Sequence, residues 1–120
     1  MPSLDYSRVY PRSRTGTTGV SVEKNLHEGE GAWINPPDRI AAITIAVHVP
    51  AGETAEFAIE CSCNHVETIG IQGTGGYWDP IEPLKATYTK SVVLMLTNAV
   101  TGIRVRCISA SSTINVCFVG

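Results

Sequence analysis

The stretch AITIAVHVPAGETAEFAIECSC, residues 42–63, decides the fold class of this protein. Within residues 43–49 the odd positions are Ile or Val and the positions between them are small or polar, which is the period-two pattern of a half-buried strand. A Pro-Ala-Gly-Glu turn interrupts the pattern, and alternation resumes over residues 55–63. The stretch therefore predicts two strands joined as a hairpin, with Glu56 and Glu60 on the solvated face.

Three more runs of apolar residues lie toward the C-terminus. Residues 90–97 are rich in Val and Leu, and we expect them to form a strand buried on both faces. Residues 102–109 and 113–119 alternate and are separated by Ala-Ser-Ser, which predicts a closing hairpin whose apolar side chains share one face. Arg104 and Arg106 would then point outward.

The fold class follows from these strand-like runs, because no apolar pattern with helical spacing persists along the chain. They predict an all-β protein, a single antiparallel β-sandwich or jelly roll of about six to eight strands. Residues 1–39 contain many Gly, Pro, Ser, Thr and Arg and few aliphatic residues. We expect them to form an extended N-terminal arm and the first irregular strands, and residues 40–120 to form the sandwich core.

The composition limits the classes of function. The chain has 120 residues, which fits one domain, and charged residues make up only 17%, below the usual quarter or so. We expect partner proteins to cover some of this weakly charged surface. The net charge of -2 argues against a general nucleic-acid binder, which gains affinity by neutralising phosphates. No stretch approaches the ~20 apolar residues of a membrane helix, and the first residues lack the apolar run of a signal peptide.

Residues 42–63, followed by VTGIRVRCISASSTINVCFVG at residues 100–120, resemble small β-sandwich virion proteins of tailed bacteriophages. The resemblance is to head decoration or cement proteins and to related tail or neck structural proteins, and it covers roughly the final two thirds of the chain. It implies a protein made in the host cytoplasm and carried in the virion, where it binds and stabilises joints between major capsid subunits. The implied partners are a major capsid protein or another virion protein, and further copies of the chain as a homo-oligomer, with a trimer favoured.

Large aromatic residues form one candidate contact surface. Trp33, Tyr77 and Trp78 lie in Gly- and Pro-rich segments, the last two directly after a Gly-Thr-Gly-Gly run that we expect to be a flexible loop. Aromatic side chains in such places are typical of protein-interface anchors or of sugar-stacking platforms. They equally fit a structural role at the ends of the sandwich. A carbohydrate-binding module that uses these rings is therefore the rival hypothesis to a virion protein.

The start of the chain carries a second candidate contact surface. Tyr and Arg alternate there with other residues, at Tyr6, Arg8, Tyr10, Arg12 and Arg14. A segment of this composition cannot bury its own apolar area, so we expect it to be mobile alone and to become ordered on a neighbouring subunit. Tyr and Arg are enriched among the residues that dominate interface energetics, which makes the arm a predicted partner-binding element.

The cysteines offer one possible metal site. Cys61, Cys63 and His65 fall at i, i+2 and i+4, so on one extended strand they would share a face and could supply three ligands to zinc. No fourth ligand is evident, and the favoured interpretation is two small core residues and a turn histidine, without metal and with reduced thiols. We expect Cys107 and Cys117 to be unbonded, because matching the apolar faces of the hairpin does not place them opposite one another.

No residues stand in a recognisable catalytic context. The histidines lack a nucleophile motif such as Gly-x-Ser-x-Gly, and the Gly-rich run lacks the Gly-Lys-Ser/Thr ending of a phosphate loop. The sequence therefore predicts no catalytic residues, no cofactor and no enzymatic activity.

Overall fold

The computed structural model describes residues 5–8, 13–14, 17–18, 21–36, 42–82 and 85–120. For the strands before residue 21 the description is of the backbone alone. In chain order the elements are β1 (Asp5–Arg8), β2 (Ser13–Arg14), β3 (Thr17–Thr18), β4 (Ser21–Leu26), β5 (Glu30–Ile34), β6 (Ile43–His48), β7 (Ala55–Ser62), α1 (Val66–Ile69), β8 (Asp79–Pro80), β9 (Val92–Leu96), β10 (Gly102–Ala110) and β11 (Ile114–Val119). No helix in these ranges is long and apolar enough to cross a membrane.

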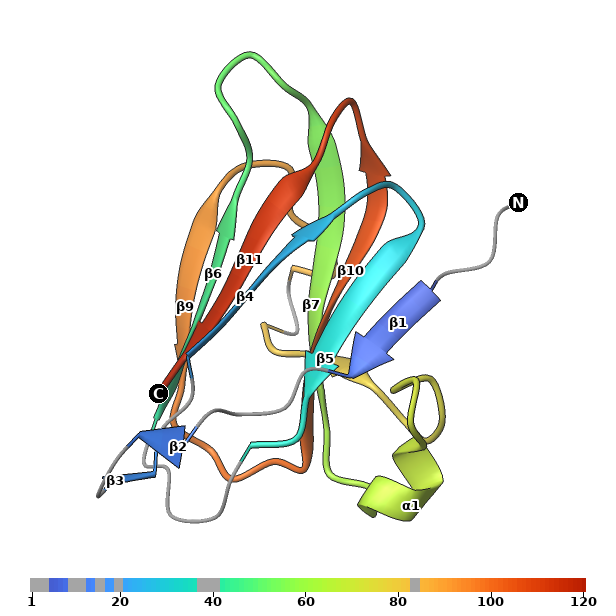
Figure 1. The fold of residues 1–120 in the computed structure, drawn as a ribbon. Helices are drawn as coiled ribbons and strands as arrows, with labels where there is room; N and C mark the ends of the chain where they lie inside the picture. Colours follow the sequence, from blue (N-terminus) through green and yellow to red (C-terminus); the bar gives the residue numbers. More distant parts are fainter. Residues whose placement is uncertain (1–4, 9–12, 15–16, 19–20, 37–41, 83–84) are drawn as a thin grey trace.

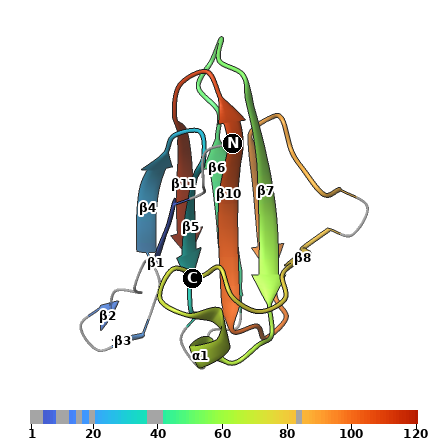
Figure 2. The same ribbon diagram turned by 90° about the vertical axis from the view of Figure 1, so that its right-hand side faces the viewer.

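Two sheets pack against each other as a sandwich (Figures 1 and 2). One has five strands in the order β1-β5-β10-β7-β8, and the other has four in the order β4-β11-β6-β9. Neighbouring strands in both sheets are antiparallel, except that β1 runs parallel to β5. Among the described strands, β2 and β3 pair with each other and with no third strand. The prediction of an all-β sandwich is confirmed.

The core lies between the two sheets and is built from the inward-facing side chains of their strands. Ile45 on β6 and Phe118 on β11 are fully buried from one side, and Ile59 on β7 and Val105 on β10 from the other. Phe57 stacks on the ring of Tyr88, with 5.7 Å between the ring centroids. The alternation in the sequence therefore identified the buried face of these strands correctly.

The two predicted hairpins are wrong. β6 and β7 lie in different sheets, and so do β10 and β11. β10 pairs with β5 and β7, whereas β11 pairs with β4 and β6. Period-two alternation shows which face of a strand is buried, but it does not show which strand forms the hydrogen bonds. At both turns the chain crosses to the opposite sheet, so the apolar faces meet across the core.

Residues before position 40 contribute to both sheets. β4 forms one edge of the four-stranded sheet and β5 lies inside the five-stranded sheet. Leu26 at the end of β4 and Ile34 at the end of β5 are fully buried. The sandwich therefore begins well before residue 40, and residues 21–34 belong to it rather than to the arm.

β9 was predicted to be buried on both faces, and this prediction is wrong. β9 is an edge strand of the four-stranded sheet, and Val93 and Met95 are 70% and 67% exposed. Val92, Leu94 and Leu96 alternate with them and pack partly against the core. A short apolar run looks the same in a sequence whether its second face is covered or open, and only the position of the strand in the sheet decides between them.

Candidate protein-binding surface

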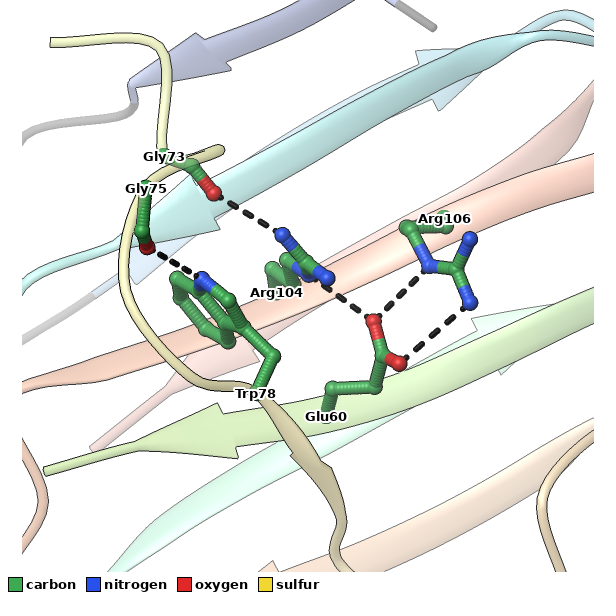
Figure 3. A network of polar contacts seen from close by, with 6 residues as sticks. All are labelled: Glu60, Gly73, Gly75, Trp78, Arg104 and Arg106. Carbon is green, nitrogen blue, oxygen red and sulfur yellow. Dashed lines mark hydrogen bonds and ion pairs between the residues drawn. The ribbon is translucent and has the colours of Figure 1, made fainter. Parts of the chain in front are cut away.

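Residues 63–78, which we call the covering loop, connect β7 to β8 and include the single turn of α1. The loop lies against the outer face of the five-stranded sheet, on the side away from the core (Figure 3). Thr101 anchors its beginning, since the hydroxyl donates to the carbonyls of Ser62 and Asn64 at 3.0 and 2.5 Å. The outer face of this sheet is therefore a packed layer and not an open surface.

A row of three side chains lies beneath the loop. Trp33 on β5, Arg104 on β10 and Glu60 on β7 are direct cross-strand neighbours in the register of the sheet. Glu60 accepts hydrogen bonds at 2.8 Å from Nε of Arg104 and at 2.8 Å from Nε of Arg106 (Figure 3). A second donor of Arg106 reaches Oε2 of Glu60 at 3.3 Å. One carboxylate thus binds two guanidinium groups.

The burial of this network corrects the prediction that Glu60 is solvated. Its side chain is only 10% exposed, and that of Arg104 is 11% exposed. Charges with so little contact to water are tolerated only when they are paired and hydrogen-bonded. Arg104 also donates to the carbonyl of Gly73 at 3.0 Å, and its guanidinium lies 4.3 Å from the ring centroid of Trp78. The network therefore joins the sheet to the covering loop.

Sequence reasoning treated these three charged residues only as members of solvated or outward faces. Arg104 and Arg106 do point away from the core, as predicted, but the covering loop shields Arg104, whose side chain is 11% exposed, while that of Arg106 is 29% exposed. The signal that could have found the network is the pattern Arg-x-Arg on one strand, with a Glu at an outward position of another. Using that signal would have required the pairing of β7 with β10.

The two tryptophans hold the covering loop from inside. Trp33 is fully buried, and its indole Nε1 donates to the carbonyl of Ile71 at 3.1 Å. Trp78 packs edge-on against Trp33, with ring centroids 6.4 Å apart, and its Nε1 donates to the carbonyl of Gly75 at 2.9 Å. Trp33 therefore has a structural role beneath the covering loop, and its ring is not available to a partner. Trp33, Tyr77 and Trp78 do not form one exposed aromatic face.

The Gly-rich run within the loop is required by close packing. Gly73 is buried with φ +70°, and a Cβ at this position would lie 2.3 Å from Cδ1 of Trp33. Only glycine allows the backbone to touch the indole ring in this conformation. The loop was predicted to be flexible, yet its carbonyls at Ile71, Gly73 and Gly75 each accept a hydrogen bond from a Trp or Arg side chain.

Two large apolar side chains of the covering loop face solvent. Ile71 is 78% exposed and Tyr77 is 82% exposed. Their backbones are nevertheless fixed, since Ile71 accepts from the indole of Trp33 and the amide of Tyr77 donates to Oδ1 of Asn64 at 2.6 Å. We call Ile71 and Tyr77 the exposed pair. Because the backbone beneath these side chains is already fixed, little backbone entropy is lost when a partner covers them.

The predicted arm residues are placed only in part. Tyr6 and Arg8 belong to β1, whose backbone pairs with β5 of the same chain. Arg14 belongs to β2. Tyr10 and Arg12 lie outside the described residues.

The possible zinc ligands are not brought together. β7 ends at Ser62 and α1 begins at Val66, so Cys61, Cys63 and His65 do not share one extended strand. Within the described ranges, no three His, Cys, Asp or Glu side chains are placed to hold a metal ion. Burial raises the pKa of the Cys61 thiol, and the neighbouring Cys63, Asp79 and Glu60 raise it further.

All four cysteines are free. Cys107 faces the core from β10 and is fully buried. Burial raises the pKa of its thiol to about 11, with smaller contributions from Glu28 and Glu30. Cys117 lies on β11 in the other sheet, at a half-buried position between the buried Val116 and Phe118. Its side chain therefore points away from the core that Cys107 faces, so the two thiols cannot meet.

The function of the covering loop and its exposed pair has to be inferred from the chemistry of their side chains. The chain matches no protein-family model, no curated protein and no solved structure.

Proposed function

We propose that this protein is a non-enzymatic structural protein that attaches to other protein subunits of a virus particle. In this role it is a capsid decoration or cement protein, which binds and stabilises joints between major capsid subunits. Because one fold can carry many functions, the proposal rests on surface chemistry rather than on the sandwich itself.

The observation that carries the proposal is the exposed pair on the covering loop. Ile71 and Tyr77 present large apolar side chains to solvent at 78% and 82% exposure. The loop beneath them is held by both tryptophans and by the Glu60–Arg104 ion pair. Aromatic and aliphatic side chains on a rigid support are the usual anchors of a protein interface.

The virion setting comes from the resemblance of residues 42–63 and 100–120 to phage head proteins. The rival carbohydrate-binding function has less support from the side chains. A sugar-stacking platform needs open ring faces, but Trp33 is fully buried and the guanidinium of Arg104 lies over the ring of Trp78. Of the three predicted aromatics, Tyr77 alone has a largely exposed ring.

The test is attachment to virus particles encoded by the same genome. Particles grown without the chain are mixed with the purified protein, and the bound fraction is measured after density-gradient sedimentation. We expect saturable binding of the natural chain. Ile71→Ala and Tyr77→Ala should each weaken it roughly thirtyfold, because a truncated interface anchor costs about 2 kcal/mol. Thr74→Ala is the matched control, since Thr74 is an exposed polar residue of the same loop.

Two outcomes would contradict the proposal. One is a chain that is absent from natural particles and does not bind to particles lacking it. The other is a panel of glycans that quenches the tryptophan fluorescence saturably, with the response abolished by Trp78→Ala. That second result would establish the carbohydrate-binding function instead.

A further inference from the structure

β9 is an open edge of the four-stranded sheet (Figure 1). On one side it pairs with β6, and no other strand of the described residues pairs with its second side. Its sequence, Val-Val-Leu-Met-Leu, contains no charge and no proline. Unpaired backbone groups along an apolar edge strand are a template for pairing with another strand.

The contacts of Ser91 indicate which backbone groups are free. The hydroxyl of Ser91, next to β9, accepts from the amide of Val49 at 2.8 Å and lies 3.5 Å from its carbonyl oxygen. The odd positions of β6 therefore direct their backbone groups toward β9, because these directions alternate along a strand. Leu94 pairs with Ile45, so it bonds inward. Val93 and Met95 consequently point their N–H and C=O groups outward.

The opposite edge of the same sheet is protected. β4 carries Glu23 and Lys24, and Lys24 occupies an inward-facing position opposite the buried Val116. Charged residues on an edge strand, especially those that point inward, prevent pairing with another chain. β9 has none of these features, and its two outward-facing side chains, Val93 and Met95, are apolar and exposed.

We propose that β9 pairs antiparallel with β9 of a second copy of this chain, about a two-fold axis at Leu94. Val93 of each copy then lies opposite Met95 of the other, and each of these pairs exchanges both backbone hydrogen bonds. The two four-stranded sheets become one continuous sheet. This inference concerns self-association and does not depend on the proposed virion function.

A second copy fits this edge because the strand is complementary to itself. In the two-fold register Val92 lies opposite Leu96, Val93 opposite Met95, and Leu94 opposite its own copy, so every pair is apolar. Lys90, the nearest charge before the strand, would lie opposite the neutral Asn98, and no like charges meet. The two-fold contact is closed and self-complementary, as in most homodimers.

The expected dimer is weak. A single strand pair buries less than the roughly 1,200–2,000 Å² of a standard interface. We therefore expect half-dissociation at micromolar to submillimolar protein, measurable by sedimentation equilibrium over a concentration series from about 10 μM to 1 mM.

Variants of the edge test the pairing. Met95→Pro removes only an outward-facing amide, which edge strands tolerate, and Val93→Lys places a charge at the contact. Each should weaken dimerisation at least tenfold, whereas Ser21→Lys on the protected edge β4 should leave it unchanged. Circular dichroism of each variant verifies folding. If Met95→Pro fails to fold, Val93→Lys still decides the question.

Disulfide trapping tests the register. In a Cys63→Ser background, Val93→Cys and Met95→Cys proteins are oxidised separately and as a mixture. The two-fold register brings these positions to a Cα separation of about 5.5 Å only across the mixed pair, which suits a disulfide. We expect a covalent dimer that forms at least tenfold faster in the mixture than in either protein alone.

Three results would overturn the inference. These are a natural chain that stays monomeric up to about 1 mM, equal cross-linking in the separate and mixed samples, and a stable trimer that neither edge variant weakens. A two-fold contact cannot close a ring of three, so the trimer implied by the phage resemblance would require another surface. Failure of particle attachment would leave these measurements unaffected, so the two proposals fail separately.

Discussion

At the scale of single residues, Glu60 is a buried carboxylate held by two arginines. It is the carboxylate for both Arg104 and Arg106, beneath a loop that excludes most water. Replacing it removes this carboxylate from both guanidinium groups, and the side chain of Arg104 is only 11% exposed. Breaking a buried pair in this way costs far more than the pair contributes relative to apolar residues of the same size.

We predict that Glu60→Ala lowers the free energy of unfolding by about 3 kcal/mol or more. Glu56→Ala is the matched control, because Glu56 lies on the same face of β7 and makes only a 3.4 Å hydrogen bond with Thr87. Its loss should cost less than about 1 kcal/mol. Urea unfolding of both variants gives the comparison, and equal losses would show that the network contributes nothing beyond a surface carboxylate.

Because of Cys107, the free energy of unfolding depends on pH in the alkaline range. Its thiol pKa is raised from 9.0 to about 11, so the unfolded chain releases this proton at lower pH than the folded chain does. Stability is therefore unaffected below about pH 9 and decreases as the pH rises toward 11. Cys107→Ala should flatten this decrease, while Cys63→Ala, at an exposed thiol, should not. Unfolding free energies at pH 8, 10 and 11 measure the difference between the two variants.

At the scale of elements, the sequence predicted strands better than their partners. The alternation over 43–49 and 55–63 identified β6 and β7 and their buried faces, because burial follows the two-residue period directly. It failed for Val93 and Met95, where an apolar run gave no sign of an open edge. The one turn of α1 was too short to leave a periodic pattern. Trp33 and Trp78 were noticed as aromatics, but their role depends on a loop path that only tertiary contacts define.

The covering loop should respond sharply to a methyl group at Gly73. Gly73→Ala places a Cβ against Trp33 at φ +70°, while Gly52→Ala has a similar φ of +81° with nothing within 4 Å. Gly52→Ala should lower the free energy of unfolding by about 1–2 kcal/mol, from backbone strain alone. Gly73→Ala adds the clash with Trp33 and should lower the free energy of unfolding by roughly 3 kcal/mol or more. Trp33 lies under the loop and Trp78 belongs to it, so only Gly73→Ala should shift fluorescence emission to longer wavelength. An unshifted emission with equal stability losses would contradict the packing described for Gly73.

At the scale of the whole molecule, the arm and the sandwich are not separate. β1 pairs with β5 through residues 5–8, so deleting residues 1–14 uncovers the edge of β5. We predict a truncated chain that still unfolds cooperatively, with a loss of about 2 kcal/mol from the missing strand pair. If the arm also binds a neighbouring subunit, particle attachment should decrease far more than thermal stability does. Full attachment by the truncated chain would assign binding to the covering loop alone.

The order of strands also determines when this chain can fold. β11 is the central link of the four-stranded sheet, since among the described strands β4 pairs with β11 alone, and β6 pairs with β11 and β9. A chain still emerging from the ribosome therefore has β4 without its partner strand, and β6 with β9 alone, until residues 114–119 are made. Folding of this sheet must wait until β11 has been made, and closing such distant contacts should take milliseconds to seconds. Ribosome-held chains that lack β11 should consequently be digested rapidly by protease, whereas chains extended past Gly120 by a long linker should resist.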